Sequence, residues 1–238
     1  WRVGVRADRA LAGGGALMPS YRSSDEAEVR DAVVKRLRAL RPTHRIIHEI
    51  QNACQGPNRI DLISVGAAEI IAVEVKSKKD KLDRLPAQVA AMRGMAHHVI
   101  AAIHEKFLIS PAYKNGPLNS KGSPPEARGA IVWAFPEAGA EAGRTWGCAA
   151  WQEPRQVVTQ CLPWTALDML WAGELRSLCT DLGVAATARS TRPQMIHALR
   201  WKCTGGDITK GICAALLRRE CVEADPPIAH GFGLAGVL

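Results

Sequence analysis

Apolar residues in the first part of the chain recur at helical spacing. Residues 23–26 (SSDE) supply a capping side chain and an acidic first turn, and Arg41-Pro42 ends the segment. The apolar stripe between these limits consists of Val29, Ala32, Val33, Leu37 and Leu40. This pattern predicts an amphipathic helix that ends at Leu40.

Strand patterns follow this helix. Residues 45–50 alternate between apolar and polar, and a turn signal at 55–58 leads into the apolar run 59–65. Residues 66–69 then turn the chain into 70–75, a β-branched run typical of a central strand. Beyond it, the pattern predicts a helix at 83–95, a short strand at 98–103 and another strand at 129–135.

The second half of the chain changes in character. Residues 110–129 are rich in Pro, Gly, Ser and Asn and predict a long loop, whereas helical patterns occupy 166–182, 192–202 and 209–222. The order of elements predicts an α/β fold with a mixed central sheet flanked by helices and a small helical C-terminal appendage. We therefore expect an irregular extension at 1–19, a core domain at 20–160, a helical module at 161–222 and a tail at 223–238.

Composition and charge narrow the classes of function. A hydrophobic content of 47% and a charged content of 23% exclude a wholly disordered chain, and no apolar run reaches the length of a membrane span. The net charge of +8 favours a polyanionic partner, nucleic acid before membrane. Seven cysteines without a CxxC pair argue against a zinc cage and a disulfide framework, which fits a cytoplasmic location.

Charged residues interrupt two of the apolar strands. The strand period of two places Glu74 and Lys76 on one face, with Val73 and Val75 on the other. Asp61 lies in the neighbouring predicted strand. Burying such charges is unfavourable unless they pair or bind a cation, and carboxylate and carbonyl oxygens suit Mg²⁺.

The arrangement of Asp61 with Glu74-x-Lys76 resembles the PD-(D/E)XK nuclease superfamily, which includes the VRR-NUC nucleases and the Holliday-junction resolvases. The segment IAVEVKSKKDKLDRLPAQV is similar to VRR-NUC-like members, because a charged turn and a helix bearing Gln88 follow the E-x-K strand. The proline of the motif name is absent, since Asn58-Arg59-Ile60 precede Asp61. The resemblance covers about residues 24–135 and implies a restriction-endonuclease-like sheet.

This resemblance implies hydrolysis of phosphodiester bonds. Asp61, Glu74 and the backbone carbonyl of Val75 would hold Mg²⁺, for which Mn²⁺ could substitute. Lys76 would orient the attacking water and offset negative charge, and Gln88 would lean over the site from its helix. A further acidic ligand is expected and has two candidates, Glu28 on the first helix and Glu49 on the first strand, between which the sequence does not decide.

Basic residues beside this motif are candidates for contacts with DNA phosphates, and this is favoured over the alternative of a merely solvated turn. They are Arg59, Lys78, Lys79, Lys81 and Arg84. Residues 170–202 loosely resemble a SAP-type helix–extended–helix module, which in its family binds DNA and which would here use Arg189 and Arg192. A plain helical bundle that stabilises the core would show the same pattern.

The sequence therefore predicts a Mg²⁺-dependent deoxyribonuclease of a phage or bacterium, acting in recombination, repair or defence. The alternative is a nucleic-acid-binding protein without catalysis on the same fold, and a third hypothesis is a structural or interaction protein whose basic charge is incidental. Nucleases of this type that cut both strands often work as dimers, so a homodimer is one expected state.

Overall fold

The computed structural model describes residues 23–51, 59–109, 122–140, 151–155, 160–220 and 224–225. Its strands are β1 Arg45–Gln51, β2 Arg59–Val65, β3 Ile70–Lys76, β4 His98–His104, β5 Ile131–Phe135 and β6 Ala224–Asp225. Its α-helices are α1 Ser24–Leu40, α2 Leu85–Arg93, α3 Ala172–Asp181, α4 Arg192–Lys202 and α5 Gly205–Arg218. In these described parts, no helix has the length and apolar character needed to cross a membrane.

The strands form one mixed sheet in the order β5-β4-β3-β2-β1-β6. β1, β2 and β3 are consecutive antiparallel neighbours, whereas β3, β4 and β5 run parallel. The parallel step from β3 to β4 contains α2 as its crossover helix, as a parallel connection requires. The predicted α/β class with a mixed sheet, flanking helices and C-terminal helices is confirmed.

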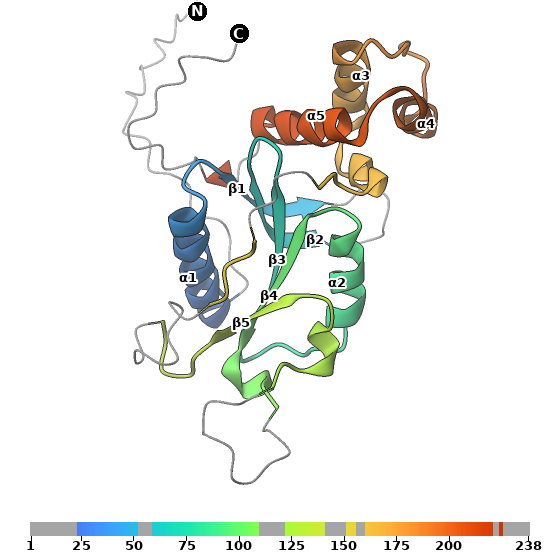
Figure 1. The fold of residues 1–238 in the computed structure, drawn as a ribbon. Helices are drawn as coiled ribbons and strands as arrows, with labels where there is room; N and C mark the ends of the chain where they lie inside the picture. The colour runs from blue at the N-terminus through green and yellow to red at the C-terminus, as the bar shows by residue number, and fades with distance from the viewer. Residues whose placement is uncertain are drawn as a thin grey trace, which may run out of the picture.

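The sheet lies between two layers (Figure 1). α1 packs on one face through its predicted stripe, in a core that also holds Trp133 stacked on Trp151 with 4.7 Å between ring centroids. α2 and the C-terminal helices share the core of the other face. β3 is buried on both faces, which explains its continuous β-branched sequence.

Local signals explain where the first helices begin. The Ser23 hydroxyl accepts a hydrogen bond from the Glu26 backbone N–H at 3.2 Å, so α1 begins at Ser24 as its capping pattern predicts. α2 is shorter than the predicted 83–95 because Asp83 and Arg84 belong to the preceding turn and Pro86 lies in its first turn.

The C-terminal helices differ from the predicted ranges. A 3₁₀ helix at Trp164–Met169 and an extended Leu170 precede α3, so 166–182 is not one helix. α5 begins earlier than predicted, at Gly205, because the Thr204 hydroxyl caps it by accepting from the Asp207 N–H. Leucines of all three helices join the core of the α2 face, so the predicted helical module shares a core with the sheet.

Some predicted segments lie wholly or partly outside the described residues. The extension at 1–19 and most of the predicted loop at 110–129 lie there, although a 3₁₀ turn at Pro125–Ala127 is described. Within the predicted tail, the structure describes only β6, which adds to the edge of β1.

Candidate active site

The candidate site lies where β2 and β3 separate. Their antiparallel pairing ends at Leu62 opposite Val73, and β3 continues beyond it with Glu74 and Lys76 paired to β4. The Val75 N–H, which would otherwise continue the ladder to β2, donates to Asp61 Oδ2 at 2.8 Å. The N–H and C=O of one strand residue point to the same edge, so the Val75 carbonyl faces the same gap. The carboxylate of Asp61 therefore lies in this gap, close to the plane of the sheet.

Glu49 on β1 is next to Asp61 and has an unusual backbone. The register places His48 opposite Leu62 and Ile50 opposite Ile60, so Glu49 and Asp61 face each other between these two pairs. Glu49 has φ of 53°, a left-handed conformation that costs a non-glycine residue about 1–2 kcal/mol. Such strain, held next to a cluster of charges, is typical of functional sites.

Arg30 of α1 connects the acidic side chains on this side of the gap. Its Nε donates to Glu26 Oε1 at 2.9 Å, and its Nη2 donates to Asp61 Oδ1 at 3.1 Å and to Glu49. Its Nη1 also donates to the backbone carbonyl of Asp61 at 3.0 Å. Burial disfavours the charge of Arg30, which is 1% exposed, but the three carboxylates outweigh burial and raise its pKa further.

The oxygens of Glu26, Glu49 and Asp61 lie within 4.8 Å of one another. Carboxylates gathered this closely are unfavourable without a cation among them. Arg30 supplies one such cation. Each carboxylate oxygen can accept more than one hydrogen bond, so each carboxylate keeps lone pairs that Arg30 does not use. This arrangement fixes the direction of the Asp61 side chain toward the gap.

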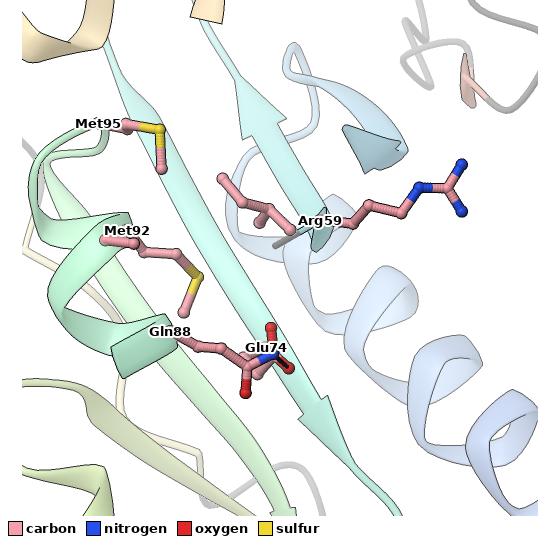
Figure 2. A pocket seen from close by; sticks show the side chains of 7 residues that line it. Arg59, Glu74, Gln88, Met92 and Met95 are labelled. Carbon is pink, nitrogen blue, oxygen red and sulfur yellow. Dashed lines mark hydrogen bonds between the residues drawn. The ribbon is translucent and has the colours of Figure 1, made fainter. Parts of the chain in front are cut away.

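Glu74, Lys76 and Gln88 form the second half of the site. One oxygen of Glu74 accepts hydrogen bonds from Lys76 Nζ and from Gln88 Nε2, and Figure 2 shows Gln88 pointing from α2 toward Glu74 on β3. Among the described residues, the other oxygen, Oε2, has no hydrogen-bond partner although it is buried, and the same holds for Gln88 Oε1. A buried oxygen without a partner is rare in folded proteins and indicates a site for water or an ion.

The two halves interact electrostatically. Burial and then the negative charge of Asp61 raise the pKa of Glu74 to about 7. Burial also raises the pKa of Asp61, although the neighbouring Arg30 opposes this. The positive charge of Lys76 lowers the pKa of both carboxyl groups, so it opposes the effect of burial in each half of the site.

The carboxylates of the site outnumber its buried cations. Four carboxylates, those of Glu26, Glu49, Asp61 and Glu74, gather around only two buried cations, Arg30 and Lys76. The half-exposed Arg59 pairs with Glu49 as a third cation, so the carboxylates still outnumber the cations. A Mg²⁺ ion would offset the remaining negative charge, and the donors are oxygens as Mg²⁺ prefers. A cavity of about 10 Å³ adjoins Glu74 and Gln88, but its other lining residues are mostly apolar, so the fit to an ion depends on the carboxylate donors. The residues present therefore fit a bound divalent ion.

The structure places the two predicted acidic residues differently. Glu49 lies in the cluster, whereas Glu28 is exposed on α1 and is not brought to the site. Glu26 of α1 is in the cluster instead, and two residues along a helix turn a side chain by about 200°, which places Glu28 on the opposite side. Glu26 could have been identified from its sequence spacing, because it continues the stripe formed by Val29, Arg30, Val33 and Leu37.

The basic residues predicted to contact phosphates lie in two separate places on the surface. Lys78, Lys79, Lys81 and Arg84 are exposed in the turn after β3, where the Asp80 carboxylate accepts from the Ser77 N–H at 2.8 Å. Lys79 also forms an ion pair of 2.6 Å with Asp25 of α1. The side chain of Arg59 is half exposed, extends away from Glu74 (Figure 2) and pairs with Glu49 at 3.4 Å.

In the C-terminal module, the two predicted arginines have different environments. Arg189 is exposed in the connection between α3 and α4. Arg192 is half-buried and donates to the carbonyls of Leu170 and Asp168, so in this structure it holds the start of α4 to the preceding segment. The geometry thus supports a packing role for Arg192.

Comparison with known proteins gives one match. A family model described as bacteriophage P4 protein cII matches residues 20–112, a segment that contains α1, β1 to β4 and every residue of the candidate site. No curated protein and no solved structure matches the chain. The chain is therefore similar to this phage protein family over less than half of its length.

Proposed function

We propose that the protein is a Mg²⁺-dependent nuclease that hydrolyses phosphodiester bonds in DNA. The observation that carries the proposal is the excess of buried carboxylates, with an unpartnered Glu74 oxygen, at the place where β2 and β3 separate. The resemblance of Asp61, Glu74 and Lys76 to the PD-(D/E)XK motif supports it. The match to a phage protein family supports a phage or bacterial setting. A part in recombination, repair or defence follows only from the resemblance to the nuclease superfamily.

In this proposal each residue has a defined part. Asp61, Glu74 and the Val75 carbonyl hold the metal, and Glu26 and Glu49 contribute directly or through water. When bound, Mg²⁺ lowers the pKa of a water and stabilises negative charge on the phosphate, and Mn²⁺ would supply the same chemistry. Lys76 places a buried ammonium group beside the reacting atoms, and Gln88 holds the Glu74 carboxylate in position.

Arg30 supports this arrangement from α1. It bonds both to the carboxylate and to the backbone carbonyl of Asp61, so it fixes the residue on which the metal site depends. Residues that orient a metal ligand in this way typically change metal affinity or activity about 10- to 100-fold when mutated. Arg30 is therefore a positioning residue in the proposed mechanism.

The test is cleavage of a supercoiled plasmid with Mg²⁺ and with EDTA, for the parent and for variants. Lys76→Ala should reduce Mg²⁺-dependent cleavage about 100-fold or more, which is the effect of one lost transition-state contact. DNA affinity should change little, because one buried lysine supplies a small part of the attraction. Asp61→Ala should abolish cleavage through loss of metal affinity.

Glu28→Gln is the matched control, because it removes an acidic residue that the structure places on the exposed side of α1. Cleavage by this variant should equal that of the parent. DNA binding by the parent without any Mg²⁺-dependent cleavage would favour the alternative, a nucleic-acid-binding protein without catalysis. Parent-like cleavage by Lys76→Ala would place the active site elsewhere.

A further inference from the structure

Among the described residues, most of the large apolar side chains that are exposed to solvent are tryptophans. Three of the four such side chains are Trp164, Trp171 and Trp201, which are 46%, 57% and 78% exposed. All three belong to the C-terminal helical part of the chain, at the edge of the molecule away from α1 (Figure 1). Large apolar side chains that gather on a surface indicate a binding site.

Two of these tryptophans are joined through α4. This helix buries Met195, Ile196 and Leu199, and its exposed side carries His197, Arg200 and Trp201. The rings of His197 and Trp201 are 6.1 Å apart, and the guanidinium carbon of Arg200 lies 4.0 Å from the ring centroid of Trp164. We call these four side chains, Trp164, His197, Arg200 and Trp201, the aromatic–cationic patch.

The segment that carries α4 is basic, although Asp168, on the same 3₁₀ helix as Trp164, pairs with Arg192 at 3.8 Å. Residues 182–206 contain Arg189, Arg192, Arg200 and Lys202, and they contain neither Asp nor Glu. Arg200 and Lys202 are exposed next to Trp201. The patch therefore offers flat aromatic faces together with positive charge. This combination complements a strand of nucleic acid, whose bases stack on rings and whose phosphates attract cations.

We propose that the aromatic–cationic patch binds unpaired bases of a DNA strand, with a base stacked on Trp201 and the phosphates near Arg200 and Lys202. In a duplex the faces of each base are stacked on the neighbouring base pairs, so an exposed indole distinguishes single-stranded from duplex DNA. The planar guanidinium of Arg200, stacked on Trp164, offers a second surface of this kind. This inference rests on the proposed nuclease function. It adds that the DNA substrate contains a single-stranded segment.

The test measures binding in EDTA, so that it does not depend on cleavage. Fluorescence anisotropy of a labelled oligothymidylate is compared with that of a duplex of equal length for the full chain and its variants. Trp201→Ala should weaken oligothymidylate binding about 5- to 150-fold, the range that corresponds to one lost base–aromatic stack. Duplex binding should change much less, and Trp201→Phe should restore part of the affinity because it keeps a ring.

Trp171→Ala is the matched control. Trp171 is comparably exposed, but Arg219 covers its ring at 4.5 Å and that guanidinium is paired with Glu174 at 2.7 Å, so the positive charge beside this ring is already neutralised. This variant should bind oligothymidylate like the parent. Trp201 is largely exposed, so Trp201→Ala should keep the parent's thermal midpoint.

Three results would overturn the inference: parent-like binding by Trp201→Ala, an equal loss on duplex and on oligothymidylate, or an equal loss in Trp171→Ala. A Trp201→Ala variant that loses self-association while keeping DNA affinity would assign the patch to contact between copies of the chain. The inference and the proposed function fail separately. Selective loss of oligothymidylate binding in a protein that never cleaves DNA would uphold the patch and refute the nuclease.

Discussion

Replacing Glu74 by glutamine should stabilise the metal-free protein at alkaline pH. Burial and the nearby Asp61 raise the pKa of Glu74 from its ordinary value of 4.5 to about 7. Between these values the folded protein keeps a proton on Glu74 that the unfolded chain has released, so stability falls as the pH rises through this window. The neutral amide introduced by Glu74→Gln keeps an oxygen that can accept from Lys76 and Gln88, but it never ionises.

The magnitude follows from the same pKa values. A pKa unit is worth about 1.4 kcal/mol, so ionising Glu74 in the folded protein costs at most about 3 kcal/mol of stability. For a chain of this length, 1 kcal/mol changes the melting temperature by roughly 2–4 °C. Glu74→Gln should therefore raise the melting temperature by up to about 6–12 °C at pH 8.5 in EDTA, and by little at pH 5.

Thermal unfolding followed by circular dichroism measures this difference at both pH values. Adding Mg²⁺ at pH 8.5 should then raise the melting temperature of the parent more than that of Glu74→Gln, because the ion stabilises the folded state only where its ligands are intact. Glu28→Gln should behave like the parent throughout, since Glu28 is exposed. A variant that is less stable than the parent at pH 8.5 in EDTA would refute the reasoning, because the Glu74 carboxylate would then be stabilising.

Further predictions concern other parts of the molecule. Glu26→Gln should reduce Mg²⁺-dependent plasmid cleavage about 10-fold or more, whereas Glu28→Gln should not, and equal rates for the two would contradict the placement of Glu26. Burial lowers the pKa of His44 to about 4, so stability should fall as the pH drops from 6.5 toward 4. Urea unfolding of His44→Gln should show a smaller fall than the parent over that range. Replacing Lys78, Lys79 and Lys81 together by alanine should make DNA affinity less dependent on salt. The slope of log affinity against log salt concentration should fall by about 0.9 per lost phosphate contact. An unchanged slope would show that these lysines are merely solvated.

Local patterns in the sequence were sufficient for most of the sheet. β2 has the predicted limits of residues 59–65, because its apolar run and its turn signals are both local. β6 was not predicted, since a strand of two residues exists only through its pairing with β1, far away in sequence. The start of α5 was placed too late because Gly205 and Gly206 are typical of a loop, whereas the Thr204 cap begins the helix before them.

The residues of the candidate site were predictable to different degrees. Glu74 and Lys76 follow from the period of a single strand. The choice of Glu26 over Glu28 depends on which side of α1 faces the sheet, and the buried stripe of that helix contains the answer. Arg30 was not predicted, because an arginine within an apolar stripe is recognised as a partner for acidic residues only when three carboxylates from separate elements converge on it.

The position of the site and the irregularity of the strands have one origin in the sequence. Ile47 and Ile50 belong to the same core, as do Ile60 and Ile63, although residues three apart in a regular strand point to opposite faces. Each strand must therefore break its alternation between its two isoleucines, and each interval contains an acidic residue, Glu49 or Asp61. If the side chains of these strands alternated regularly, one isoleucine of each pair would leave the core on the α2 face and expose apolar surface, or the acidic side chains would be buried against α2. The apolar pattern thus directs both carboxylates toward Arg30 and the gap beside β3, so the fold itself concentrates negative charge where a cation can bind.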